Sequence, residues 1–352
     1  MKSLLVLLIV VQFVLACVAT ENNGFKIPLH EHRLSADIVK ARQAVFVKNN
    51  KFAEGGVFKT DYLSADLFIG TPAQYFEVAV SNGLSDAWVF DINATKQYPD
   101  RSNGYNATES KTSKALNKQF ELEDGFFYVS GSWYKDTMNF DGIHITQSFG
   151  SVLNTGAPFI TANGTFGLSH RAPEYYEQGN PAAPIDQLLS KFQDKKFTLY
   201  LKSYQYQYYP KYNIPDSFLT LGARDDYCKT SPVTIQLESN ELDDRYVANV
   251  DYFKYGSQTF NAPGSVSFDI GVSSLLFPRN ELNRVIKLIG AKFDSSLGLY
   301  TYPCSEINEL GLIEFGIQTY SFLITSYDYL INIGSNNGQC VLALEPNNPE
   351  QL

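Results

Sequence analysis

The sequence predicts an all-β fold of two pseudo-symmetric β-lobes with few short helices, and three observations lead to this prediction. Aromatic residues make up 14% of the chain, and aromatic side chains are enriched in strands. Short apolar runs are separated by Asn-Gly and Asp-Gly breakers, as at residues 82, 124, 141 and 163. A segment near residue 80 also recurs near residue 268, and this internal repetition indicates duplicated lobes.

Local patterns predict the individual elements. Residues 62–69 and 75–80 are apolar runs on either side of a Gly-Thr-Pro turn, and they are the clearest strands. A helix is expected at 184–192, where proline opens the segment and apolar residues recur at helical spacing. A second helix is expected at 279–289, which has one apolar face. The tyrosine-rich run at 200–212 is interpreted as a strand with an exposed turn rather than as a binding element.

Composition narrows the possible functions. The 352 residues allow two domains or one large two-lobed unit, and 44% apolar content is enough for a sizeable core. The chain has 28 Lys and Arg against 37 Asp and Glu. Because nucleic-acid binding needs a basic face, a net charge of −9 predicts no nucleic-acid partner.

The first 19 residues are interpreted as a signal peptide. Lys2 precedes an apolar stretch at 4–16, and small residues end the segment at Ala19. This stretch is too short to span a bilayer, and no later stretch is apolar for long enough. A buried strand or helix, or a bacterial lipoprotein signal ending at Cys17, are the alternatives. We therefore expect a protein that is secreted or located in a lysosomal or other acidic compartment.

Cysteines and glycosylation sequons fit that compartment. Three cysteines remain once Cys17 leaves with the signal, so at most one internal pair can form. Cys304 and Cys340 lie in the same C-terminal region and are the expected disulfide, whereas Cys228 is interpreted as a small buried residue. Three Asn-x-Thr sequons predict N-glycosylation, and they begin at Asn93, Asn106 and Asn163.

The internal repeat places two polar loops at corresponding positions. Residues 80–90 resemble residues 268–278, 188 positions later, and each copy has a strand, a polar residue, Gly, an apolar residue, Ser and a second strand. The corresponding loop residues are Ser81, Asn82 and Gly83 in the first copy and Asp269, Ile270 and Gly271 in the second. Two lobes with one such loop each suggest that the loops meet where the lobes join.

This pattern resembles that of the pepsin-like aspartic peptidases (family A1), over nearly the whole chain. Matching segments include the Ile-Gly-Thr-Pro run at 69–72, Trp88-Val89, the Phe-Gly-Leu element at 166–168, the propeptide-like start at 26–30 and the Cys304–Cys340 pair. The resemblance implies the bilobal pepsin-like acid protease fold. It also implies a signal peptide at 1–19, a propeptide-like segment at 20–57, an N-terminal lobe at 58–198 and a C-terminal lobe at 199–352.

This sequence differs from the family that it resembles at the catalytic position itself. Members hydrolyse peptide bonds with two Asp-Thr/Ser-Gly loops, whose carboxylates share one proton and act as base and acid. Here Asp269 is retained and Ser81 occupies the position of the first Asp. Because a serine hydroxyl does not hold that charge, the resemblance implies an impaired or inactive peptidase. The family's hydroxyls also link the two loops, and Ile270 has none, so the link is expected to be lost on that side.

The resemblance also assigns further site residues. It implies a substrate cleft lined by Gly83, Ser85, Asp124, Gly125, Gly271 and Ser273. Among these, Asp124 takes the position of the tyrosine that closes the family's β-hairpin flap over substrate. Asp86 lies on the outgoing strand and is interpreted as an ordinary surface or turn residue rather than a replacement carboxylate.

No cofactor or metal is expected. His30 and His32 are separated by one residue, but no third ligand lies nearby in the sequence, and no Gly-rich phosphate loop with Lys is present. The second lobe is expected to be C-terminally truncated. Gly167 lies 86 residues after Ser81, and the same step from Asp269 ends beyond residue 352.

The sequence is compatible with three functions. The first is a secreted aspartic-peptidase homologue without peptidase activity that binds extended peptides or proteins in the cleft, as a monomer without a membrane span. The second is an active aspartic endopeptidase that relies on Asp269. The third is a truncated product without a function of its own.

Overall fold

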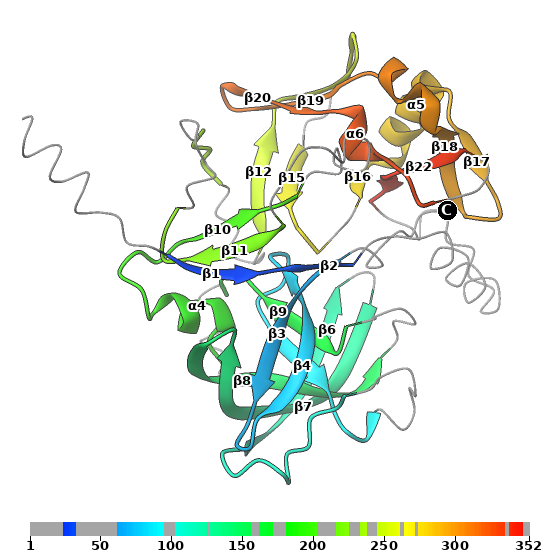
Figure 1. Ribbon diagram of the computed structural model, residues 1–352. Coiled ribbons are helices and arrows are strands. Elements are labelled where there is room, and N and C mark those ends of the chain that lie inside the picture. Colours follow the sequence, from blue (N-terminus) through cyan, green and yellow to red (C-terminus); the bar gives the residue numbers. More distant parts are fainter. Residues whose placement is uncertain are drawn as a thin grey trace, which may run out of the picture.

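The computed structural model describes twelve stretches of the chain: residues 24–32, 62–94, 103–124, 127–155, 162–171, 181–202, 216–224, 233–237, 245–260, 264–271, 274–334 and 338–347. Several predictions lie outside these residues, namely the signal peptide, Cys228, Gly125, Ser273 and most of the tyrosine-rich run. Strands dominate the described chain and form two groups, which are blue to green and yellow to red in Figure 1. The predicted all-β, bilobal fold class is therefore confirmed.

The N-terminal group is one large sheet. Its strands are β2 (His30–His32), β3 (Tyr62–Ile69), β4 (Gln74–Ser81), β5 (Ala87–Phe90), β6 (Lys114–Asp124), β7 (Phe127–Phe140), β8 (Ile143–Thr155) and β9 (Gly164–Gly167). They pair in the order β2-β3-β4-β9-β5-β8-β7-β6, and β3 also pairs with β7. The apolar run predicted as a strand at 62–69 coincides with β3, which contributes buried side chains to the lobe's main apolar cluster.

Helix α4 (Pro184–Leu189) covers this sheet and contributes four buried residues. The helix was predicted to continue to residue 192, but it ends earlier. Its last turn tightens, because the N–H groups of Lys191 and Phe192 bond to carbonyls three residues back. Phe192 then packs against the core cluster instead of extending the helix.

A three-stranded sheet lies between the two groups of strands (Figure 1). It contains β1 (Phe25–Pro28), β11 (Phe218–Leu221) and β10 (Phe197–Tyr200), in that order. Ile27 of β1 is fully buried in the N-terminal core. The N-terminal segment is thus an integral strand of this sheet.

The C-terminal group has shorter strands. They are β12 (Tyr246–Val250), β13 (Tyr252–Tyr255), β14 (Gln258–Phe260), β15 (Gly264–Phe268), β16 (Leu275–Phe277), β17 (Lys292–Asp294), β18 (Leu299–Pro303), β19 (Ile313–Ile317), β20 (Tyr320–Ile324), β21 (Leu330–Ile331), β22 (Gln339–Leu342) and β23 (Leu344–Pro346). The helical elements are α5 (Arg279–Ile289), the 3-10 turn η3 (Cys304–Glu309) and α6 (Ser326–Tyr329). Helix α5 coincides with its prediction and buries its apolar face in a second core cluster.

The predicted disulfide is present in this lobe. Cys304 and Cys340 are bonded with an S–S distance of 2.06 Å, and the bridge joins η3 to β22. Among the described residues no helix is long and apolar enough to cross a membrane.

The two halves differ around their polar loops. In the N-terminal half, β9 pairs with both β4 and β5 and so joins the strands on either side of the Ser81 loop. In the described C-terminal residues, β15 pairs with β12 and β16 pairs with β23, with no strand shared between them. Strand β4 alternates buried residues, whereas β15 is mostly exposed. Among the described residues, the Asp269 loop therefore has fewer strand pairings from its own half.

Candidate active site

The two repeated loops meet at one point, as their sequence similarity predicts. Ser81 at the end of β4 donates a hydrogen bond from Oγ to Oδ1 of Asp269, which follows β15, over 3.1 Å. Each loop also binds its own polar side chain through a backbone N–H. The N–H of Gly83 donates to Ser81 Oγ at 3.1 Å, and the N–H of Gly271 donates to Asp269 Oδ1 at 2.7 Å.

Both glycines are required by this close approach. A Cβ atom on Gly83 would overlap the carboxylate of Asp269, and a Cβ on Gly271 would lie 2.6 Å from Ser81 Oγ. Since real Cβ contacts are longer than this, a side chain at either position would separate the two polar groups. The Gly residues of the repeat therefore allow the hydroxyl and the carboxylate to touch.

Asn82 links the loops more strongly than the sequence suggested. Its Nδ2 donates to the carbonyl of Phe268 at 2.7 Å, and its Oδ1 accepts from the N–H of Ile270 at 2.7 Å. These two backbone groups flank Asp269, so one amide side chain holds the peptide on both sides of the carboxylate. Ser169 Oγ donates to the carbonyl of Asn82 and fixes this residue to the loop after β9.

Ile270 has no side-chain group that could form a hydrogen bond across the loops. Its side chain instead packs against the N-terminal core cluster. Asn82 supplies both bonds across the loops, which was not predicted from the sequence. The signal was its residue type, because a carboxamide carries a donor and an acceptor on one short side chain.

The chemistry available at this point is that of one carboxylate and one hydroxyl. Asp269 Oδ1 accepts from Ser81 Oγ and from the N–H of Gly271. Asp86 does not supply a second carboxylate. Its side chain forms an ion pair with the guanidinium of Arg171, which is itself buried.

The remaining predicted cleft residues are only partly placed. Asp124 is the last residue of β6 and pairs with Phe127 at the start of β7, so it lies beside the tip of a β-hairpin. Ser85 is buried beyond the Ser81 loop. The role of both residues in a cleft stays a prediction.

The three sequons have different exposure. Asn93 is exposed, and Asn106 is partly exposed, with its Oδ1 accepting from the hydroxyl of Thr108 in its own sequon at 2.7 Å. Asn163 is only 9% exposed, and its Oδ1 accepts from the N–H of Glu77 at 3.1 Å. The structure therefore ranks Asn163 below the other two as an acceptor for a glycan.

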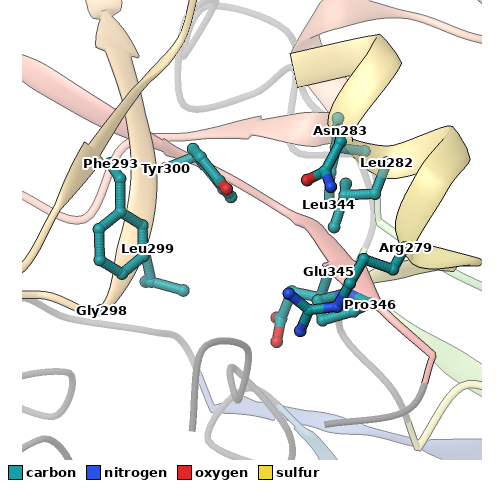
Figure 2. A pocket seen from close by; sticks show the side chains of 10 residues that line it. All are labelled: Arg279, Leu282, Asn283, Phe293, Gly298, Leu299, Tyr300, Leu344, Glu345 and Pro346. Carbon is teal, nitrogen blue, oxygen red and sulfur yellow. The ribbon is translucent and has the colours of Figure 1, made fainter. Parts of the chain in front are cut away.

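A pocket in the C-terminal lobe offers no alternative peptide site. Figure 2 shows it between α5, the β17–β18 hairpin and β23, lined by Arg279, Leu282, Asn283, Phe293, Gly298, Leu299, Tyr300, Leu344, Glu345 and Pro346. Its volume of about 20 Å³ has room for about one water molecule. No cluster of three or more His, Cys, Asp or Glu side chains that could hold a metal is found in the described part of the chain.

Comparison with known proteins gives the same family as the loops. The eukaryotic aspartyl protease family matches residues 62–352. Gastricsin of Cavia porcellus is 25% identical over 92% of this chain and 86% of its own length. Aspartic protease 1 of Caenorhabditis elegans is 25% identical over 81% of this chain and 73% of its own length, and renin-2 of Mus musculus is 24% identical over 90% and 80%. A match over most of the chain, together with two repeated loops that meet at Asp269, means that this protein belongs to the eukaryotic aspartyl protease family.

Proposed function

We propose that this chain is a secreted aspartic-protease homologue that binds extended peptides between its two lobes without hydrolysing them. The observation that supports the proposal is the contact between Ser81 Oγ and Asp269 Oδ1, at the position where the family places two carboxylates. The proposal assigns Asp269 the retained acidic position and Ser81 the substituted one. We expect the protein to act as a monomer.

The loss of hydrolysis follows from the number of carboxyl groups that can take up and donate a proton. A dyad needs one ionised carboxylate to deprotonate water and one protonated carboxyl to donate to the scissile carbonyl. Ser81 already donates its hydroxyl proton to Asp269, and it does not ionise in the working pH range of such a dyad. General acid–base catalysis contributes about 10²- to 10⁴-fold in rate. Losing one of the two carboxyl groups should therefore lower the rate of hydrolysis by at least about 10²-fold.

Peptide binding does not need the second carboxylate. Extended peptides are held mainly by main-chain hydrogen bonds to strands and loops, with side-chain pockets adding selectivity. The N-terminal half has an eight-stranded sheet that supports the Ser81 loop. Asn82 holds the Asp269 loop beside it through two hydrogen bonds. Ser81 and Asp269 then form a polar floor, a hydroxyl bonded to a carboxylate, beneath a bound backbone.

The test is proteolysis of a denatured protein at about pH 3–6, the range in which a carboxylate pair titrates. The purified secreted chain is compared with Ser81→Asp, Asp269→Ala and the double variant. We expect no cleavage by the natural chain, cleavage by Ser81→Asp, and none once Asp269 is also replaced. Cleavage by the natural chain that Asp269→Ala abolishes would overturn the proposal and favour an active endopeptidase that relies on Asp269.

Binding is measured separately on the same samples. A library of extended peptides is screened by fluorescence polarisation, with circular dichroism as the check that each variant is folded. We expect a subset of peptides to bind the natural chain and to be displaced by one another. A folded chain that binds no peptide would refute the binding role even if proteolysis is absent.

A further inference from the structure

Three threonine hydroxyls from separate segments of the N-terminal lobe converge on one point of its surface. Thr112 Oγ1 lies 3.1 Å from Thr71 Oγ1 and 3.3 Å from Thr137 Oγ1, and the oxygens of Thr71 and Thr137 are 3.5 Å apart. Thr71 follows β3, Thr112 precedes β6 and Thr137 belongs to β7. Each of the three residues is at least partly exposed, so the hydroxyls form a triangle that solvent can reach.

Backbone hydrogen bonds fix the triangle. The N–H of Gly70 donates to the carbonyl of Thr137 at 2.9 Å, and the N–H of Lys111 donates to the carbonyl of Thr71 at 2.8 Å. The N–H of Thr71 donates to Ser110 Oγ at 3.1 Å. These bonds tie the three segments together. A ligand therefore meets hydroxyls that are already in place, and binding costs little ordering of the chain.

Two lysines lie beside the triangle on the same face of the sheet. Lys114 of β6 pairs directly with Lys135 of β7. Lys135 comes two residues before Thr137 on β7, and side chains two apart in a strand share a face. Both lysines are exposed, and like charges directly opposite each other across a sheet are destabilising. Neither lysine forms an ion pair with a described residue, so nothing in that part of the chain compensates their repulsion.

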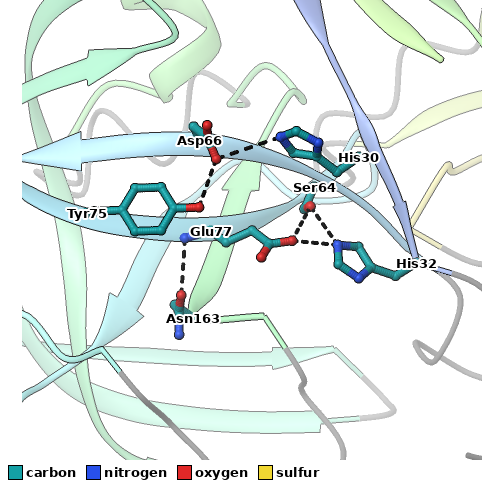
Figure 3. A network of polar contacts seen from close by, with 7 residues as sticks. All are labelled: His30, His32, Ser64, Asp66, Tyr75, Glu77 and Asn163. Atoms are coloured by element: carbon teal, nitrogen blue, oxygen red, sulfur yellow. Dashed lines mark hydrogen bonds and ion pairs between the residues drawn. The ribbon is translucent and has the colours of Figure 1, made fainter. Parts of the chain in front are cut away.

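Several acidic side chains of this lobe are engaged with other partners. Asp136, next to Lys135 in β7, is buried and accepts a hydrogen bond from the hydroxyl of Tyr105 at 2.8 Å. Pairs of basic and acidic side chains in this lobe are His30–Asp66 and His32–Glu77, which Figure 3 shows, together with His170–Asp186 and Arg171–Asp86. The lysine pair differs from these because its positive charge faces solvent without a carboxylate from the described residues.

Further lysines extend along the same edge of the sheet. Strand β6 is the outermost strand of the eight-stranded sheet, and the exposed residues Lys111, Lys114 and Lys118 follow one another just before it and along it. At physiological ionic strength, charges more than about 8 Å apart are largely screened from each other. The local group of lysines therefore decides which molecules approach, despite the net charge of −9. A line of positive charges along one edge fits an elongated polyanion.

We propose that the three threonines and the lysine pair form an oxyanion site for the sulfate groups of an anionic polysaccharide. A sulfate ester presents three terminal oxygens, which match three hydroxyl donors, and hydroxyl protons rotate to reach an acceptor. The ammonium groups of Lys114 and Lys135 donate charge-assisted hydrogen bonds to the same oxygens. A carboxylate has two oxygens, and a phosphodiester has two that are not bridging, so each leaves one donor unmatched. Sulfate groups repeated along the polysaccharide bind the further lysines of this edge.

The experiment titrates the purified full chain with a fluorescently labelled, heparin-derived oligosaccharide at neutral pH and about 0.15 M salt, and fluorescence anisotropy reports binding. We expect saturable binding that inorganic sulfate displaces and that the desulfated oligosaccharide does not show. Lys114→Gln with Lys135→Gln should weaken binding about tenfold, as expected for two surface charge pairs. The matched control, Lys287→Gln with Lys292→Gln, removes the same charge from exposed positions of the C-terminal lobe and should bind like the natural chain.

Variants of Thr112 test the hydroxyls at constant charge. Thr112→Val removes a hydroxyl that contacts both of the others and should weaken binding about fivefold, whereas Thr112→Ser keeps the hydroxyl and should bind normally. Circular dichroism checks that every variant is folded.

Several results would overturn the proposal. They are absence of binding, equal binding of the desulfated oligosaccharide, equal loss in the two lysine double variants, and unchanged affinity in Thr112→Val. Binding of anionic lipid vesicles or of an acidic phosphopeptide through Lys114 and Lys135, in place of the oligosaccharide, would also overturn it. If nothing binds, the lysines serve only to keep the edge strand β6 from pairing with another chain. None of these readouts depends on cleavage or on peptide binding at Asp269.

Discussion

Replacing Asn82 by Ala is the most direct perturbation of the loop contact. The substitution removes both hydrogen bonds that flank Asp269, and it leaves the carbonyl of Phe268 and the N–H of Ile270 without that partner. Leaving a buried polar group unsatisfied costs about 1–3 kcal/mol. Ile270 is partly buried and Phe268 is exposed, so the lower end applies to each group. We expect the loop that carries Asp269 to be destabilised by about 2 kcal/mol.

Native-state proteolysis measures this cost without assuming that two lobes unfold together. Cleavage of a transiently open loop follows the population of its open form, and 2 kcal/mol corresponds to about a 30-fold increase. Cleavage near residues 264–274 by a neutral protease should therefore accelerate by about that factor in Asn82→Ala. The matched control is cleavage of the β6–β7 hairpin in the same samples, which should keep its rate.

A rescue variant sharpens the test. Asn82→Thr combined with Ile270→Thr places one hydroxyl on each loop and should recover most of the protection. If Asn82→Ala leaves the cleavage rate near Asp269 unchanged, the loop is held by other contacts. The inference that Asn82 clamps it would then be wrong.

Further predictions concern the disulfide, a charged pair and the sequons. Replacing Cys304 and Cys340 by Ala should destabilise the C-terminal lobe by about 4 kcal/mol, the chain-entropy value for a 36-residue separation, as measured by urea unfolding. The hydrogen bond to its carboxylate partner raises the pKa of His170 although burial opposes it, so the pair stabilises the fold below the ordinary histidine pKa. The melting temperature of His170→Gln should therefore fall below that of the natural chain at about pH 5.5 and converge with it above the raised pKa; an equal difference at both pH values would contradict this. Mass spectrometry after enzymatic deglycosylation should find a glycan on Asn106 and none on Asn163, whose amide oxygen is bonded inside the lobe; a fully occupied Asn163 would refute the ranking.

The elements that the sequence predicted well are those with local signals. The strand at 62–69 and the helix at 279–289 coincide with β3 and α5, because a short apolar run closed by a turn predicts a strand and a single apolar face predicts a helix. The meeting of Ser81 and Asp269 was also predictable, because a repeated loop in each half implies a shared axis. The end of α4 was not, since packing of Phe192 on the core decided it.

The contacts that escaped prediction join residues far apart in sequence. His32 and Glu77 have no common period or motif, and only the pairing of β2 with β3 beside β4 brings them together. Likewise, the sequence identified what Ile270 lost but not what Asn82 gained. Such cross-element bonds depend on side-chain positions set by the tertiary fold, which single-sequence patterns do not encode.

The clamp by Asn82 has a consequence for motion between the lobes. Asp269 belongs to the C-terminal half by sequence, yet N-terminal residues hold the backbone on both sides of it, and Ile270 packs into the N-terminal core. A rotation of the C-terminal lobe would therefore leave the distance between Ser81 and Asp269 unchanged. The backbone of β15, which leads into Asp269, would absorb the rotation instead. A ligand lying across the two loops would rest on a floor that stays fixed while the wall contributed by the C-terminal lobe moves.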